Sequence, residues 1–199
     1  MTVRHAIGWE SVIAACCVFR NAVPMMTRGF LCLLAVLVST PLLAETPLNT
    51  LTEQEKKDGW KLLFDGKKIE GWRSYGNESF PEQGWVVDNG TLHKQADIRG
   101  GDIMTVDTYE NFEFSWEWKL LEKGNNGVKY FIIPERKATV GHEYQMIDDS
   151  SVKDPYSGNA SFYLIVAPRS DKPNRPMGEW NHSRLVVKGN HVEHWLNGE

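Results

Sequence analysis

Nine residues in the middle of the chain, Phe112 to Leu120, alternate without a break between large apolar and polar side chains. The apolar positions are Phe112, Phe114, Trp116, Trp118 and Leu120, and the polar positions are Glu113, Ser115, Glu117 and Lys119. A period of two predicts a half-buried β-strand, and the aromatic rings on one face predict that this face lies in the middle of the core. The opposite face is then either ordinary surface or the floor of a binding cleft.

Short apolar or alternating segments, separated by turn residues, continue this β pattern on both sides of the central strand. A single short helix is predicted at residues 51–59, where Thr52 is the cap, Glu55 follows three residues later and Gly59 ends the helix. About ten short strands with almost no helix indicate an all-β sandwich or jelly roll. The other predicted strands cover residues 60–64, 71–73, 84–87, 91–93, 128–133, 141–147, 162–166, 180–187 and 191–196.

The glycine-rich turn at residues 123–127 comes directly after the central strand. It suggests that residues 128–133 return alongside residues 111–120 as a neighbouring strand. Lys129 would then lie near Glu117 on the outer face of the sheet.

The N-terminal residues have the pattern of a targeting segment. Residues 25–44 combine a short basic start, an apolar run and a suitable cleavage position at Ala44, which is typical of a secretory signal peptide. We therefore expect a periplasmic or secreted protein, with no stable membrane span once the signal is cleaved. The extension before the signal reflects either a start codon chosen too early or an unusually long leader. The expected organisation is an N-terminal extension (1–24), a signal peptide (25–44), a linker with a short helix (45–58) and one domain (59–199).

Cysteine and charge narrow the classes of function. All three cysteines, Cys16, Cys17 and Cys32, precede the domain, so the domain has no disulfide and no cysteine-ligated metal. The chain has 22 basic and 26 acidic residues, a net charge of −4, and no basic run is longer than two residues. This composition argues against nucleic acid and anionic membranes as partners.

The printed chain stops at Asn197-Gly198-Glu199, and Asn-Gly is a strong turn dipeptide. A return strand is expected after this turn. The sandwich is therefore expected to be truncated, that is, incomplete at its C-terminus, with unpaired strand edges.

Candidate chemistry lies on the polar faces of two predicted strands. Glu143 and Gln145 share one face, opposite Tyr144 and Met146, and they could hold sugar hydroxyls or transfer a proton; the alternative is an ordinary solvated face. Lys129 could stabilise a developing oxyanion, or it could form a surface ion pair.

Three further polar residues have simple structural explanations as well as functional ones. Asp102 follows two glycines and could stand at the rim of a cleft or cap a bulge. Asn126 is most simply a turn residue. His194 could be a general base or a metal ligand, or it could be a hydrogen-bonded histidine at the edge of the core.

Several motifs, taken together and in order, resemble those of the bacterial 3-keto-disaccharide hydrolase domain family. The resemblance covers residues 59–199, nearly the whole expected domain. The motifs are Leu63-Phe64-Asp65-Gly66-Lys67, Gly71-Trp72, Gly100-Gly101-Asp102-Ile103, Tyr109-Glu110-Asn111-Phe112-Glu113-Phe114, Glu117-Trp118-Lys119, Gly124-Asn125-Asn126-Gly127-Val128-Lys129-Tyr130, Gly141-His142-Glu143-Tyr144-Gln145-Met146-Ile147-Asp148-Asp149, Gly178-Glu179-Trp180-Asn181 and His194-Trp195-Leu196-Asn197-Gly198.

The resemblance implies a concanavalin A-like jelly roll and an exported enzyme that acts on a small sugar substrate, a 3-keto glycoside. Such an enzyme needs a base, a group that polarises the ketone and an acid near the leaving oxygen, and a divalent metal ion could be the polariser. In this scheme Glu143 is the base, Lys129 the polariser and His194 the acid or a metal ligand. The expected contacts to hydroxyls or to a metal are Asp102, Glu117, Asn126, Gln145 and Asp148.

Two other functions use the same scaffold. The first is a non-catalytic, lectin-like sugar-binding module. The second is a conventional glucanase, which needs two carboxylates roughly 5–9.5 Å apart on the concave face, and Glu117 with Glu143 is the pair to consider.

Overall fold

The computed structural model describes residues 11–21, 48–136 and 138–199. The predicted signal peptide, residues 25–44, lies outside the described residues. The described residues contain the strands, the α-helix and three short 3-10 helices of an all-β jelly roll. No helix in these ranges is long and apolar enough to cross a membrane. The elements are β1 (Ser11–Asn21), α1 (Glu53–Lys57), β2 (Trp60–Leu62), β3 (Trp72–Ser74), β4 (Trp85–Asp88), β5 (Thr91–Lys94), β6 (Ile103–Thr105), β7 (Phe112–Leu120), β8 (Asn125–Tyr130), η1 (Pro134–Arg136), β9 (His142–Ile147), η2 (Asp149–Ser151), η3 (Pro155–Ser157), β10 (Asn181–Lys188) and β11 (His191–Leu196).

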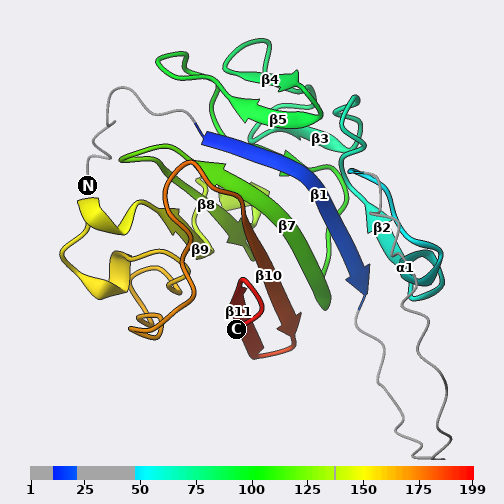
Figure 1. The fold of residues 1–199 in the computed structure, drawn as a ribbon. Helices are drawn as coiled ribbons and strands as arrows, with labels where there is room; N and C mark the ends of the chain where they lie inside the picture. The colour runs from blue at the N-terminus through cyan, green and yellow to red at the C-terminus, as the bar shows by residue number, and fades with distance from the viewer. Residues whose placement is uncertain (1–10, 22–47, 137) are drawn as a thin grey trace, which may run out of the picture.

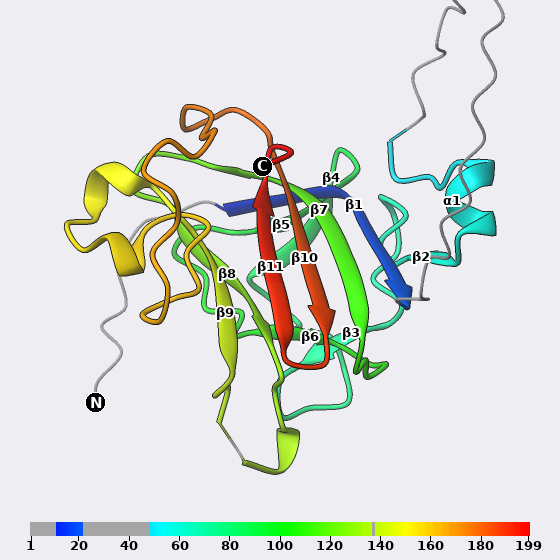
Figure 2. The same cartoon turned by 90° about the horizontal axis from the view of Figure 1, so that it is seen from below.

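One large antiparallel sheet and two small ones make the layers. The large sheet has the strand order β11-β10-β7-β1-β5-β4, and β2 also pairs with β1. Figure 1 shows β1, β7 and β10 side by side as a curved surface. The pairs β3–β6 and β8–β9 form the small sheets, and Figure 2 shows the β8–β9 hairpin beside β10 and β11 as a separate layer.

The central strand is where the alternation predicts it. Trp116 and Trp118 are completely buried at 0% exposure, and the Trp116 ring meets the Tyr144 ring of β9 edge to face at 4.9 Å between centroids. The indole N–H of Trp118 donates to the Ser183 hydroxyl of β10 at 2.8 Å. Burying aromatic surface of this size is the main stabilising contribution that a single strand can make to a core.

Part of the polar face of β7 is covered by side chains of β10, the neighbouring strand in the same sheet. Arg184 forms an ion pair with Glu113 at 2.8 Å, and the ring of His182 lies 2.7 Å from the Ser115 hydroxyl. Glu113 and Ser115 are consequently buried although they point away from the main core.

Several local predictions are confirmed. Thr52 and Glu55 form a reciprocal capping box at α1. The predicted strands at residues 84–87 and 91–93 pair as β4 and β5, and Asn89 and Gly90 in the turn between them both have positive φ, as a tight hairpin requires. The hairpin β10–β11 also forms at the predicted place.

The predicted pairing of residues 128–133 with the central strand β7 is wrong. Residues 125–127, expected as a turn, already belong to β8, and β8 pairs with β9 rather than β7. The physical reason is that β10 and β1 occupy the two edges of β7, so neither edge is left for a hairpin. Lys129 therefore faces Glu143 and not Glu117.

The predicted strand at residues 162–166 is also wrong. This segment makes only isolated bridges, and Leu164 has a φ of 60°, which breaks an extended backbone. Ile165 donates its N–H to the Phe162 carbonyl at 2.8 Å, so the segment forms a turn whose apolar side chains stay exposed.

Part of the N-terminal extension, residues 11–21, belongs to the fold. Strand β1 comes from within residues 1–24 and fills the slot between β7 and β5, with register pairs that run from Ser11 opposite Leu120 to Asn21 opposite Phe112. Its sequence is a continuous, largely apolar run, which is typical of a strand in the middle of a sheet. The targeting pattern does not predict a strand in this part of the chain.

Candidate active site

A cavity of about 600 Å³ lies between the inner face of the large sheet and the two small sheets. Aromatic residues form much of its wall, including Trp116 from β7 and Trp72 from β3. Polar groups come from Asp102, just before β6, and from the β8–β9 hairpin. Apolar walls with a few polar groups are the usual composition of a small-molecule site. The polar side chains of the cavity include Asp102, Asn126, Lys129 and Glu143.

The hairpin register places two charged side chains opposite each other. Lys129 of β8 is the direct cross-strand neighbour of Glu143 of β9, so both project from the same face. Gly127, two residues before Lys129, is also on this face. A Cβ atom at Gly127 would collide with Oε1 of Glu143, so the carboxyl group lies directly over the glycine.

The surroundings of Glu143 favour its neutral form. Burial is the largest effect and raises the pKa of Glu143 above its usual value. The positive charge of Lys129 acts in the opposite direction, and the negative charge of Asp102 raises the pKa further. The charges of Lys129 and Asp102 both act on the Glu143 carboxyl group, and all three side chains line the cavity. The structure therefore brings three predicted site residues together.

These three charged groups are not used to hold the fold together. Within the described residues, the side chains of Asp102, Lys129 and Glu143 make no hydrogen bond or ion pair with the protein, whereas Asn126 accepts a hydrogen bond from the Gly127 N–H at 2.8 Å. A half-buried carboxyl group without a hydrogen-bonding partner is available to a ligand. Perturbed carboxyl groups in a cavity are characteristic of functional sites.

Glu117 lies on the opposite side of β7. It is the cross-strand neighbour of His182 on the outer face, and its negative charge acts on that histidine. The conventional glucanase pair of Glu117 and Glu143 is therefore wrong, because the two carboxylates do not share a face of the sandwich.

His194 lies near the cavity but does not line it. Its Nδ1 is 3.2 Å from the Ala160 carbonyl, which can only accept, so this nitrogen carries the proton. Nε2 then accepts a hydrogen bond from the Tyr130 hydroxyl at 3.0 Å. Burial lowers the pKa of His194 to about 4, and the ring borders a separate hollow of about 260 Å³. The neutral ring is thus fully hydrogen-bonded at a distance from Glu143.

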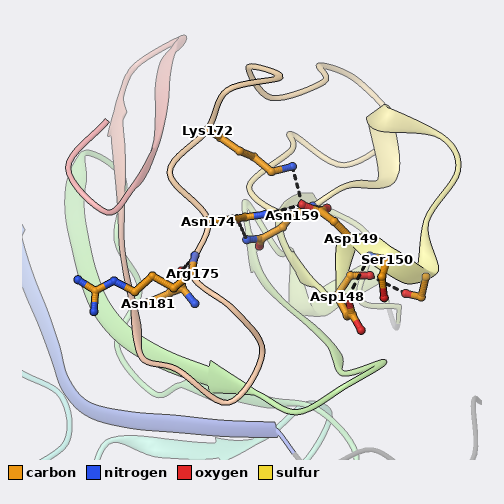
Figure 3. A network of polar contacts seen from close by, with 9 residues as sticks. Asp148, Asp149, Ser150, Asn159, Lys172, Asn174, Arg175 and Asn181 are labelled. Carbon is orange, nitrogen blue, oxygen red and sulfur yellow. Dashed lines mark hydrogen bonds and ion pairs between the residues drawn. The ribbon is translucent and has the colours of Figure 1, made fainter.

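Asp148 and Asp149, at the end of β9, belong to a structural network (Figure 3). Asp148 accepts hydrogen bonds from the N–H groups of Lys123 at 2.7 Å and Ser150 at 2.9 Å, so it caps η2. Asp149 accepts from the Asn159 N–H at 2.7 Å and pairs with Lys172 at 2.9 Å. These contacts attach the long loop to the end of the hairpin.

Gln145 is the remaining predicted site residue, and it also lies outside the cavity wall. It is buried at 5% exposure, and its side-chain oxygen has no partner among the described residues. It shares a face of β9 with Glu143 but sits deeper in the hairpin, opposite Gly127.

The described residues do not form a metal-binding cluster. No group of three or more His, Cys, Asp or Glu side chains in the ranges that the structure describes could hold an ion. Among the described residues, the cavity wall includes three carboxylates, Asp102, Asp107 and Glu143, and Asp107 is paired with Lys61.

Sequence reasoning missed two features of the site. The sequence predicts that Gly127 is a turn residue. In the structure Gly127 lies within β8, and the absence of a side chain makes room for the carboxyl group of Glu143. Phe131 was not singled out, although it lines the cavity with a φ of 57°. The alternating pattern of residues 128–133 placed Phe131 on the same face as Lys129, and this was the available signal.

The chain is an all-β jelly-roll protein, and it is similar to solved structures whose names describe them as glycosyl hydrolases. A crystal structure of a "putative glycosyl hydrolase" from Parabacteroides distasonis has a TM-score of 0.67 and 36% sequence identity, covering 76% of this chain and 74% of that one. A second such structure from the same organism has a TM-score of 0.53 and 28% identity, covering 64% of this chain and 68% of that one.

The sequence defines the family more narrowly. Residues 59–199 match the 3-keto-alpha-glucoside-1,2-lyase-like domain, and the chain belongs to this family. A 3-keto-disaccharide hydrolase from Bacteroides thetaiotaomicron is 29% identical over 167 residues, which is 71% of this chain. The chain spans 57% of the length of that relative.

Proposed function

We propose that this protein cleaves 3-keto glycosides by base-assisted elimination followed by hydration. The observation that supports the proposal is the half-buried carboxyl group of Glu143, which has a raised pKa, no hydrogen bond within the described residues, and Lys129 as its cross-strand neighbour. Family membership and the name of the Bacteroides relative support the same substrate class.

The ketone makes the first step feasible. A carbonyl at C3 acidifies the hydrogen on C2, so the Glu143 carboxylate removes this proton and negative charge develops on the ketone oxygen. The Lys129 ammonium stabilises that charge. A base whose pKa lies closer to neutrality than that of an ordinary carboxylate is better matched to this proton transfer.

Elimination then releases the alcohol. The electron pair from the C2–H bond forms the C1–C2 double bond, and the C1–O bond to the aglycone breaks. Because His194 is hydrogen-bonded outside the cavity, we assign the proton that the leaving oxygen needs to Glu143, which has just received one. Water adds across the double bond in a second step and yields the 3-keto sugar.

The decisive experiment replaces Glu143 with glutamine in the full chain. Glu143→Gln keeps the shape of the side chain but removes the base, and we expect turnover of a 3-keto disaccharide to fall by at least about 10³-fold. Glu117→Gln is the matched control, because this glutamate lies on the outer face, and it should keep nearly full turnover. Unchanged turnover in Glu143→Gln would contradict the proposal.

A sugar-binding module is the second candidate, because the cavity also has the aromatic walls that sugar rings favour. Calorimetry separates the two functions. Binding of plain and 3-keto sugars with equal affinity and no turnover would identify a lectin-like protein, whereas a preference for the ketone would support the enzyme.

A further inference from the structure

Phe131 combines a bulky side chain with a backbone conformation that such residues avoid. It directly follows β8 and has a φ of 57°, in the left-handed region where a Cβ atom is crowded. Among the described residues it is the one aromatic residue with positive φ. Strained backbone of this kind persists where the surrounding structure enforces it, and it concentrates at ligand sites.

Neighbouring rings support the side chain from one side. The Phe131 ring lies 5.4 Å from the Tyr130 ring and 5.5 Å from the His142 ring, measured between centroids. Tyr130 is in turn held by its hydrogen bond to His194. Phe131 nevertheless remains 41% exposed, so the fold holds an aromatic ring in position and leaves much of it uncovered.

Phe131 follows β8 directly, in the β8–β9 hairpin that carries Lys129 and Glu143. Phe131 lines the same cavity as Lys129 and Glu143. It is two residues after Lys129, so their Cα atoms are at most roughly 7 Å apart. A sugar ring bonded to the one that reacts would extend over this distance.

We propose that Phe131 is a stacking platform for the second ring of the substrate, the ring that leaves as the aglycone. An aromatic face provides a rigid apolar surface for the C–H face of a pyranose. This proposal rests on the proposed function for the assignment of the reacting ring, but stacking itself requires no chemistry. Phe131 would thus determine specificity for disaccharides over simple glycosides.

The test is Phe131→Asn, because asparagine tolerates positive φ and removes the ring. We expect KM for a 3-keto disaccharide to rise about tenfold, which is about 1.4 kcal/mol. KM for the methyl 3-keto glucoside should stay unchanged, as should kcat for both. Phe131→Trp, which keeps an aromatic face, should behave like the wild type.

Leu164→Asn is the matched control. Leu164 is also apolar, 54% exposed and at a φ of 60°, but it does not line the cavity. Both asparagine variants should have unfolding midpoints equal to or above that of the wild type, because backbone strain is relieved. Only Phe131→Asn should alter KM. Equal changes of KM for both substrates, or no change with a lowered midpoint, would show that Phe131 merely supports the hairpin corner.

Calorimetry separates this inference from the proposed function. Plain maltose and glucose are titrated into wild type and Phe131→Asn. If the wild type turns over neither keto substrate but Phe131→Asn weakens only maltose binding, the proposed reaction fails and the platform is supported. If maltose and glucose respond equally to the substitution, the platform is refuted whatever the turnover.

Discussion

Strand β9 contains one acidic residue, Glu143, and is followed by two more, Asp148 and Asp149. The carboxyl groups differ in their hydrogen bonds, and the pKa shifts of Glu143 and Asp148 have opposite directions. In the cavity, Glu143 is half-buried, has no hydrogen bond within the described residues and has a raised pKa. At the end of the strand, Asp148 is buried but capped by backbone N–H groups, and Asp149 has a lysine and amide partners. Burial alone therefore does not identify a carboxyl group that is available to a ligand. The informative property is burial without partners.

The largest expected effect on stability is at Asp149. Asp149→Ala removes the ion pair with Lys172 and leaves the buried Asn159 N–H without its acceptor, so we expect the free energy of unfolding to fall by about 2–3 kcal/mol. Urea unfolding measures this. Asp171→Ala, at an exposed pair with Arg169, is the control and should cost less than about 1 kcal/mol. A loss of turnover per folded molecule in Asp149→Ala would place that region in the site after all.

The next effect is catalytic, at Gly127. Gly127→Ala adds a methyl group where the Glu143 carboxyl lies, so the base must shift. We expect kcat/KM to fall about thirtyfold, which is about 2 kcal/mol, with little change in the unfolding free energy. The control is Ser170→Ala, in an exposed loop. Gly189→Ala would not be suitable, because Gly189 has positive φ and alanine would be strained there. Full activity in Gly127→Ala would mean that the position of Glu143 is not critical.

Replacement of Glu143 should affect stability in the opposite direction from replacement of Asp149. The native state desolvates the Glu143 carboxylate without offering it a hydrogen bond, so Glu143→Gln should leave the unfolding free energy unchanged or raise it by up to about 1 kcal/mol. Thermal unfolding at neutral pH is the measurement. A loss above about 2 kcal/mol would show that Glu143 is a structural residue.

The smallest effect is the pH dependence, where the two regions should show opposite signs. Because the native pKa of Glu143 is raised, the native state binds its proton more tightly, and stability falls as pH rises from 4.5 through the native pKa. Burial alone would raise the pKa of Asp148, but hydrogen bonds from Lys123 and Ser150 outweigh it and lower the pKa. Stability from Asp148 is therefore lost as pH falls below 3.8.

Unfolding curves of Glu143→Gln and Asp148→Asn across this range can be compared with those of the wild type. Each substitution should remove one of the two trends and leave the other. Trends of the same sign would contradict the contrast between the two regions.

Most of the fold was predictable because its signals are local. The alternation in β7 and the capping box of α1 depend on side-chain periodicity and on cap residues a few positions apart, and both are confirmed. The pairing of β8 was not predictable, because it depends on which strands already occupy the edges of β7. The short segment at residues 162–166 was misread because its apolar run has no strand partner.

For the candidate site, the sequence patterns predicted some of the polar residues that line the cavity, while their roles stay predictions. Glu143, Lys129 and Asp102 meet in one cavity because each lies on a polar face or at a rim that the sequence pattern marks. His194 was placed among them through family resemblance, and no pattern could show that both of its ring nitrogens are occupied. Phe131 was missed because a positive φ leaves no trace in side-chain periodicity.

Strand β1 has a consequence for how the chain could be processed. It precedes Ala44, the predicted cleavage position, yet it separates β7 from β5 in the middle of the large sheet. A peptidase that cut there would sever the covalent link to β1 and leave the strand held by its ladder alone. Cleavage at this position would then weaken the large sheet, and release of β1 would separate β7 from β5 and divide the sheet into two parts.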